Sequence, residues 1–176
     1  AFAAFLSSFL TTERRESRFS EREPWSPRTG IVALESLPVA WIALCLGVAL
    51  GATGAFIAIF SQPRGLQNPG IYFMIQAAAL LVGRAVTGRY ADRHGRAAVI
   101  IPGISLIAAS LLLLPMAKGI PPFLVSAALL GFGFGIAQPA AMALLIDRVL
   151  PERRGLAVST FFTGYDSGNC IGAILL

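Results

Sequence analysis

The feature that most constrains this chain is the alternation of long apolar runs with short clusters of arginine. From Pro69 to Val86 the only charged residue is Arg84, and the run from Ala97 to Ala117 carries no charge. A helix of about 20 apolar residues is long enough to cross a hydrocarbon core of roughly 30 Å. Each run therefore predicts a transmembrane helix. The charged stretch between them, from Gly88 to Arg96, predicts a short loop at a membrane face.

The composition also indicates an integral membrane protein. Of the 176 residues, 56% are hydrophobic and 13% are charged, with a mean hydropathy of +0.73, whereas soluble domains are about a quarter charged. The net charge is +5, but no basic helix interleaved with aromatic residues is present, so we expect membrane lipid and no nucleic acid as a partner. Twelve of the 14 Lys and Arg residues lie in alternate connecting segments. The positive-inside rule places these segments in the cytoplasm and predicts a multi-pass protein of the cell inner membrane.

The predicted fold class is all-α, a polytopic transmembrane helical bundle. We expect residues 1–10 to be the end of a preceding transmembrane helix, and residues 11–37, with five Arg and five Glu, to be a charged cytoplasmic linker. Residues 38–176 form the predicted transmembrane bundle, with spans at about 38–60, 69–88, 97–117, 122–146 and 155–176. Because apolar sequence stands at both ends, we interpret the chain as a fragment of a longer one.

Glycines recur at helical spacing in several of these spans. Gly47 and Gly51 are four residues apart in the first span, and Gly164, Gly168 and Gly172 repeat this spacing in the last. Small residues at every fourth position let helix backbones approach closely in lipid, so these faces predict helix–helix contacts. In the fourth span, Pro139 lacks the N–H that would bond the carbonyl of Gly135, which predicts a loosened helix there.

Polar side chains inside the spans are the candidate functional residues. Gln76, Gln138 and Tyr165 are candidates for lining a substrate cavity, although Gln76 would serve equally as a hydrogen-bonding contact to a neighbouring helix. Asp166 is the one acid inside a predicted span. A carboxylate at that depth costs about 2.5 to 3.5 kcal/mol on insertion scales, so it is normally neutralised, paired or hydrated. Asp166 is therefore a candidate for proton coupling, and a structural hydrogen bond is the alternative.

The charged stretch and the last connecting loop carry motifs of one known family. Residues 88–96 follow the pattern Gly-x-x-x-Asp-Arg-x-Gly-Arg, and residues 151–155 are Pro-Glu-Arg-Arg-Gly. Both resemble loops of the major facilitator superfamily of secondary transporters. The resemblance implies a partial six-helix half of the major facilitator fold, with the spans as helices 7 to 11 of the carboxy-terminal half and residues 1–10 as the tail of helix 6.

The resemblance also implies a gate, in which the charged stretch locks the cytoplasmic ends of the helices in the outward-facing state. The gating residues it implies are Gly88, Arg89, Asp92, Arg93, Gly95 and Arg96. The alternative is that these arginines only hold the loop at the anionic inner leaflet. We expect the nearby Arg84 to snorkel towards the interface, or else to pair with an acid such as Asp92 or Asp147.

Transport is what the resemblance implies, since periodicity and loop charge establish only a membrane bundle. The expected function is that of a fragment of a secondary active transporter, which moves a sugar or drug-like small molecule across the inner membrane by alternating access and proton-coupled efflux. Its expected partners are that small-molecule substrate and the amino-terminal half of the same transporter. The alternatives are a non-transporting membrane subunit and an inactive truncated half.

Enzyme chemistry is not expected. His94 is the only histidine, and the cysteines number two, Cys45 and Cys170. These residues form no cluster with metal-ligand or nucleophile spacing, so we expect no metal site and no cofactor. The two cysteines are interpreted as small packing residues.

Overall fold

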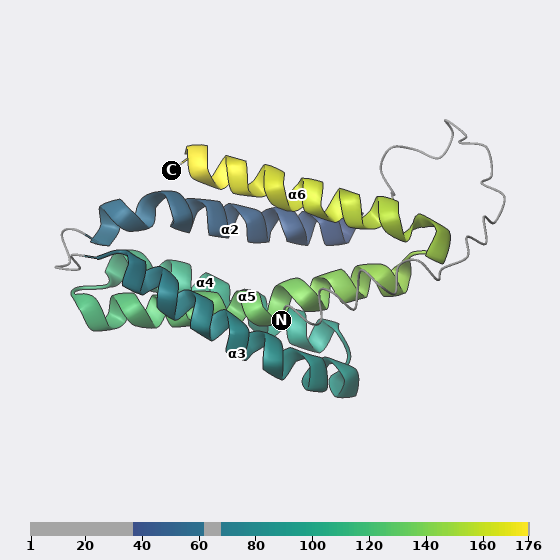
Figure 1. The fold of residues 1–176 in the computed structure, drawn as a ribbon, viewed down its shortest axis with the longest axis horizontal. Coiled ribbons are helices and arrows are strands. Elements are labelled where there is room, and N and C mark those ends of the chain that lie inside the picture. Colours follow the sequence, from purple (N-terminus) through teal and green to yellow (C-terminus); the bar gives the residue numbers. More distant parts are fainter. Residues whose placement is uncertain (1–36, 62–67, 176) are drawn as a thin grey trace, which may run out of the picture. The chain divides into compact units, whose positions relative to one another are not determined.

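The computed structural model describes residues 37–61 and 68–175, and all regular structure in these residues is helical (Figure 1). The predicted all-α class is confirmed. The elements are α2 (Leu37–Ser61), α3 (Gly70–His94), α4 (Ala97–Met116), α5 (Ile120–Arg148), the 3-10 helix η4 (Pro151–Arg153) and α6 (Arg154–Leu175). The predicted helix end at residues 1–10 and the predicted linker as far as residue 36 lie outside the described residues.

Four of the described helices are long and apolar enough to cross a membrane. These segments are Pro38–Ile57, Gly70–Thr87, Ala98–Met116 and Ile120–Arg148. The fifth predicted span corresponds to α6, whose 22 residues would reach about 33 Å. α6 is not one of these four helices, because a run of polar residues around Asp166 lowers its hydropathy.

The predicted loop at 88–96 is wrong in its extent. α3 continues through Gly88 to His94, and only Gly95 and Arg96 separate it from α4. Gly95 has a φ of 85°, a left-handed conformation that glycine adopts without a steric penalty and that commonly ends a helix. Asp147 and Arg148, which were predicted in the following loop, are likewise the last residues of α5. Neither segment contains a helix-breaking residue strong enough to stop the helix earlier.

The helices pack as a pair and a trio (Figure 1). α2 lies beside α6, and α5 packs along α3 and along α4. A buried apolar cluster joins the pair to the trio, with Val39 of α2 and Phe161 of α6 in the same cluster as Val99 of α4 and Leu145 of α5. The side chains of this cluster are hydrophobic, so van der Waals packing contributes to holding the pair and the trio together.

The pair of α2 and α6 is in direct backbone contact through glycine. A Cβ atom added to Gly51 would collide with the carbonyl oxygen of Asn169, and one added to Gly168 would collide with that of Leu44. Gly172 meets Val48 in the same way. Because the residue numbers of successive contacts rise in both helices, α2 and α6 run parallel. The predicted close-packing faces are confirmed.

α3 and α5 also meet through glycine, and the contact repairs the backbone at Pro139. A Cβ atom on Gly83 would lie 2.7 Å from the carbonyl oxygen of Phe132 and 3.1 Å from the Cα of Gly135. The hydroxyl of Thr87 donates to the carbonyl of Gly83 at 2.8 Å and to that of Gly135 at 3.3 Å. Thr87 thus supplies the Gly135 carbonyl with a donor in place of the N–H that Pro139 lacks, and α5 continues as one helix through Pro139.

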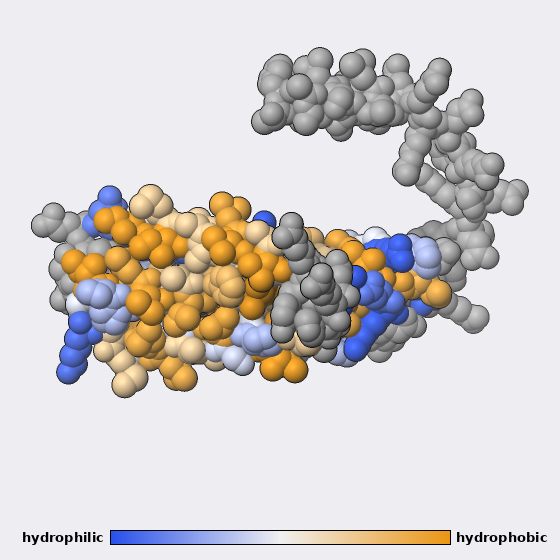
Figure 2. All heavy atoms as spheres, turned by 90° about the horizontal axis from the view of Figure 1, so that it is seen from below, coloured by the Kyte–Doolittle hydropathy of each residue, from blue (hydrophilic) through white to orange (hydrophobic). Residues whose placement is uncertain are grey.

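The outer surface of the bundle is apolar. Large hydrophobic side chains are exposed on every α-helix, among them Trp41, Leu81, Leu112, Val125 and Ile174. Figure 2 shows hydrophobic residues over the middle of the bundle and hydrophilic residues towards its two ends. Cys45 and Cys170 are also exposed, so their interpretation as packing residues is wrong. Such a surface is suited to lipid, which solvates apolar side chains that water would not.

The glycine contact between α2 and α6 generates a stability prediction with a control in the same helix. Gly51→Ala places a methyl group against the Asn169 backbone, and we expect it to lower the free energy of unfolding by about 1 to 3 kcal/mol. Gly54→Ala, where nothing lies within 4 Å, should leave stability unchanged or slightly raised. Unfolding in mixed detergent micelles, followed by far-UV circular dichroism, measures both. Equal losses from the two substitutions would contradict the backbone contact.

Candidate functional site

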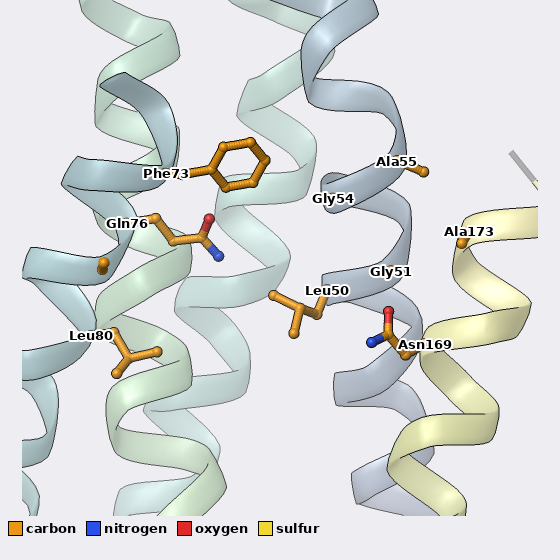
Figure 3. Close-up of a pocket in the computed structure, with 10 residues that line it drawn as sticks. Leu50, Gly51, Gly54, Ala55, Phe73, Gln76, Leu80, Asn169 and Ala173 are labelled. Carbon is orange, nitrogen blue, oxygen red and sulfur yellow. The ribbon is translucent and has the colours of Figure 1, made fainter. Parts of the chain in front are cut away.

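A cavity of about 560 Å³ opens between α2, α3 and α6 (Figure 3). Its wall is mostly apolar and comes from three helices that are separate in the sequence. The lining residues are Leu50, Gly51, Gly54, Ala55, Phe73, Gln76, Ala77, Leu80, Asn169 and Ala173. Sites for small organic molecules usually have volumes of about 300 to 1,000 Å³ and combine an apolar wall with a few polar groups.

Two amide side chains supply the polar groups of this wall. Gln76 is buried, with 7% of its surface exposed, and its amide points from α3 towards Leu50 of α2 (Figure 3). Asn169 lies on α6 beside Gly51. An amide donates and accepts hydrogen bonds, so both side chains can orient a polar ligand group. The structure places Gln76 in the cavity wall, while its role in substrate binding stays a prediction.

The same glycine contacts that join the helices hold these two amides in place. A Cβ atom on Gly131 of α5 would collide with the backbone carbonyl of Gln76, and one on Gly51 with the backbone carbonyl of Asn169. The Oδ1 atom of Asn169 is also only 2.7 Å from the position of such a Cβ atom on Gly51. The absence of a side chain at residue 51 therefore makes room for both the backbone and the side chain of Asn169.

Beyond the amides, one face of α3 continues from the cavity wall to a charged residue. Phe73, Gln76, Ala77 and Leu80 all line the cavity, and Arg84 follows Leu80 by four residues. Side chains three and four residues apart share a helix face, so Arg84 lies on the cavity face about one turn beyond the last lining residue. On α6 the lining residue Asn169 has Asp166 three residues before it, on the same face by the same rule.

Arg84 and three of the predicted site residues lie towards this end of the cavity. Nη2 of Arg84 donates to Oε1 of Gln138, on α5, at 3.4 Å. Tyr165 and Asp166 are consecutive residues of α6, the helix that supplies Asn169 to the cavity wall. Gln138 and Tyr165 are half-buried, and Asp166 is exposed. We call Arg84, Gln138, Tyr165 and Asp166 the polar cluster.

The structure shows the partner of Asp147, one of the two acids expected to pair with Arg84. Nε of Arg96 lies 2.6 Å from Oδ2 of Asp147, and Nη2 of Arg96 lies 3.5 Å from Oδ1. Asp147 is therefore the partner of Arg96 and not of Arg84. This pair joins the start of α4 to the end of α5. The side chains of the other gating candidates, Arg89, Asp92 and Arg93, lie outside the described part of the chain, so the gate stays a prediction.

A second cavity, of about 510 Å³, lies between α2 and α4. Its wall is apolar except for Cys45 and Thr53. The Thr53 hydroxyl donates to the carbonyl of Ala49 at 2.7 Å, within its own helix. That hydrogen bond uses the donor that a ligand would need, so this cavity is less suited to specific binding than the one between α2, α3 and α6.

Two contacts of the candidate site were not among the expectations from the sequence. Asn169 lines the cavity, and Arg84 donates a hydrogen bond to Gln138. The signal for Arg84 was its spacing from Gln76 and Leu80, which puts all three on one helix face. The pairing with Gln138 across α3 and α5 had no signal in the sequence, because it depends on the packing of these two helices.

The ion pair between Arg96 and Asp147 generates a prediction of modest size. The side chains are 34% and 52% exposed, so solvent screens their attraction. A double-mutant cycle with Arg96→Ala and Asp147→Ala should give a coupling energy of about 0.2 to 1 kcal/mol in the free energy of unfolding, measured at low and high salt. Strict additivity of the two single losses at low salt would show that the pair makes no contribution.

Comparisons with known proteins agree with this architecture. Residues 1–175 match the family model of the Major Facilitator Superfamily. The chain is 30% identical over 136 residues to the 3-(3-hydroxy-phenyl)propionate transporter of Escherichia coli, covering 76% of this chain and 34% of that protein. It is 29% identical over 147 residues to the multidrug resistance protein MdtG of Salmonella typhi, covering 79% and 36%.

The chain thus spans about a third of the length of these curated relatives. No solved structure matches it significantly. The family consists of transporters and not of enzymes, which agrees with the expectation from the sequence. The family model covers nearly the whole chain, and it coincides with a helical bundle that carries the motif of residues 88–96. This chain belongs to the major facilitator superfamily of membrane transporters.

Proposed function

We propose that this chain is part of a secondary active transporter, in which the cavity between α2, α3 and α6 is a portion of the substrate pathway. The observation that carries the proposal is this cavity of about 560 Å³, where an apolar wall holds the amides of Gln76 and Asn169. Membership of the superfamily supports the mode of action, alternating access about a site near the middle of the membrane.

The substrate class follows from the chemistry of the wall. Sugars expose many hydroxyl groups and need many hydrogen-bonding partners, whereas the wall offers two amides among ten lining residues. Of the two classes expected from the sequence, a drug-like molecule with a large apolar part is the better match. The relatives named for a hydroxyphenylpropionate and for multidrug resistance support small organic substrates, and the latter supports efflux.

We further propose that the chain is the carboxy-terminal half of the transporter, with α2 to α6 as helices 7 to 11. The charged segment at 11–37 supports this register, because it has the composition of a linker between two halves. The relatives are about three times as long as the matched region, so the amino-terminal half is the proposed partner. In this register the connections between α3 and α4 and between α5 and α6 are cytoplasmic, and the Arg96–Asp147 pair belongs to the gate.

Asp166 is the proposed site of proton coupling, with Tyr165 and Gln138 beside the substrate. Asp166 is an exposed carboxylate on the cavity face of α6, and it forms no ion pair with a residue that the structure describes. An acid that is not locked in an ion pair is free to exchange a proton with water in the cavity.

Asp166→Asn tests the coupling directly. In proteoliposomes that contain the full-length protein from its gene, we expect accumulation of ethidium or 3-(3-hydroxyphenyl)propionate driven by a proton gradient to fall to background, because the amide cannot carry the proton. Exchange of the same substrate across the membrane, without a gradient, should persist. The control is Ser167→Ala at the next residue, which is also exposed. Gradient-driven accumulation by Asp166→Asn at the control level would remove Asp166 from the coupling mechanism.

A further inference from the structure

Arg84 is a permanent positive charge in an apolar helix, and the described residues do not neutralise it. Among them, no carboxylate forms an ion pair with Arg84, and its hydrogen bond is to the neutral amide of Gln138 at 3.4 Å. Arg84 is exposed, and it stands three residues before the end of the apolar segment Gly70–Thr87. An exposed arginine that has no described acid as a partner, on the helix face that lines the cavity, is available for contact with a ligand.

The position of Arg84 relative to the cavity indicates where the apolar and charged parts of that ligand would lie. Phe73, Leu80 and Leu50 form an apolar wall, and Arg84 follows on the Leu80 face at one end. A ligand that fills the cavity therefore has an apolar body, and its charged group lies at the end that is closest to the polar cluster.

The donors at that end are arranged for a carboxylate. A guanidinium presents planar pairs of N–H groups that bind a carboxylate through two parallel hydrogen bonds. Oε1 of Gln138 already accepts from Arg84, which leaves the amide N–H₂ of Gln138 as a donor. Asp166 is the acid of the polar cluster, but it lies on α6 and does not form an ion pair with Arg84, so the guanidinium remains available.

We propose that Arg84, with Gln138, forms a carboxylate-binding subsite, and that the substrate is an organic acid with an apolar body. The inference rests on the proposed transport function and adds the charge of the substrate to it. Arg84 bonds the carboxylate, Gln138 orients the guanidinium, and the wall around Phe73 and Leu80 holds the apolar body.

Two probes of the same shape test the charge preference. 3-Phenylpropionate carries a carboxylate, and 3-phenylpropionamide replaces it with a neutral group of nearly equal size. Binding of both to the full-length protein in lipid nanodiscs is measured by isothermal titration calorimetry. We expect the wild-type protein to bind the carboxylate at least about tenfold more tightly than the amide, which is the scale of a charge-assisted hydrogen bond.

Substitutions of Arg84 then assign the preference to this residue. Arg84→Gln should lower the carboxylate affinity about tenfold or more and leave the amide affinity within about twofold, while Arg84→Lys should restore part of the preference. Lys118→Gln is the control, because it removes one positive charge from the turn between α4 and α5, outside the cavity. It should change neither affinity. Circular dichroism and size-exclusion profiles matching the wild type establish that each variant is folded.

The outcomes separate this subsite from the transport function. A wild-type protein that binds both probes equally, or an Arg84→Gln variant that weakens both probes equally, overturns the carboxylate subsite. Substrate exchange by the same preparations, measured with ethidium, shows in that case whether transport itself stands. Absence of both binding and exchange would overturn the subsite and the proposed function together.

Discussion

Direct contact between helix backbones at glycine is the constraint on which the rest of the structure depends. In lipid, the hydrophobic effect does not drive helices together, so packing must hold them. Glycine supplies this packing three times, between α2 and α6, between α3 and α5, and between α4 and α5. The pair is built on the first of these contacts and the trio on the other two, and the cavity lies between α2, α3 and α6.

The glycine contacts also position the chemistry. The two amide-bearing residues of the cavity wall, Gln76 and Asn169, are the same residues whose backbone carbonyls meet Gly131 and Gly51. Each amide is therefore attached to a point of the helix that cannot shift without breaking a helix–helix contact. The helix face that begins with Gln76 then carries Arg84 to the polar cluster. Packing and site geometry are consequences of one set of contacts, which is how a membrane bundle holds a polar site with precision.

Much of this arrangement could be predicted from the sequence, and the remainder depends on tertiary contacts. Apolar run lengths predicted the helices, and the spacing of Gly164, Gly168 and Gly172 predicted a packing face. The sequence did not show that α3 would continue to His94. The charges and glycines of residues 88–96 favoured a loop, whereas in the structure helix propensity prevails as far as His94. The hydrogen bond from the Thr87 hydroxyl to the carbonyl of Gly135 could not be predicted from the sequence either. The two residues are 48 positions apart and meet only after α3 and α5 pack.

The proposed transport function requires that the α3 face carrying Leu80 border a water-filled substrate cavity. Leu80 lines the cavity, whereas Val82, 57% exposed, lies on the opposite side of the same helix, where lipid is expected. In full-length protein with Cys45 and Cys170 replaced by serine, Leu80→Cys and Val82→Cys are compared for reaction with a charged, membrane-impermeant thiol reagent. We expect that residue 80 reacts, and that 3-phenylpropionate slows the reaction, while residue 82 stays unreactive. Equal reactivity at both positions, or reaction at residue 82 alone, would contradict it.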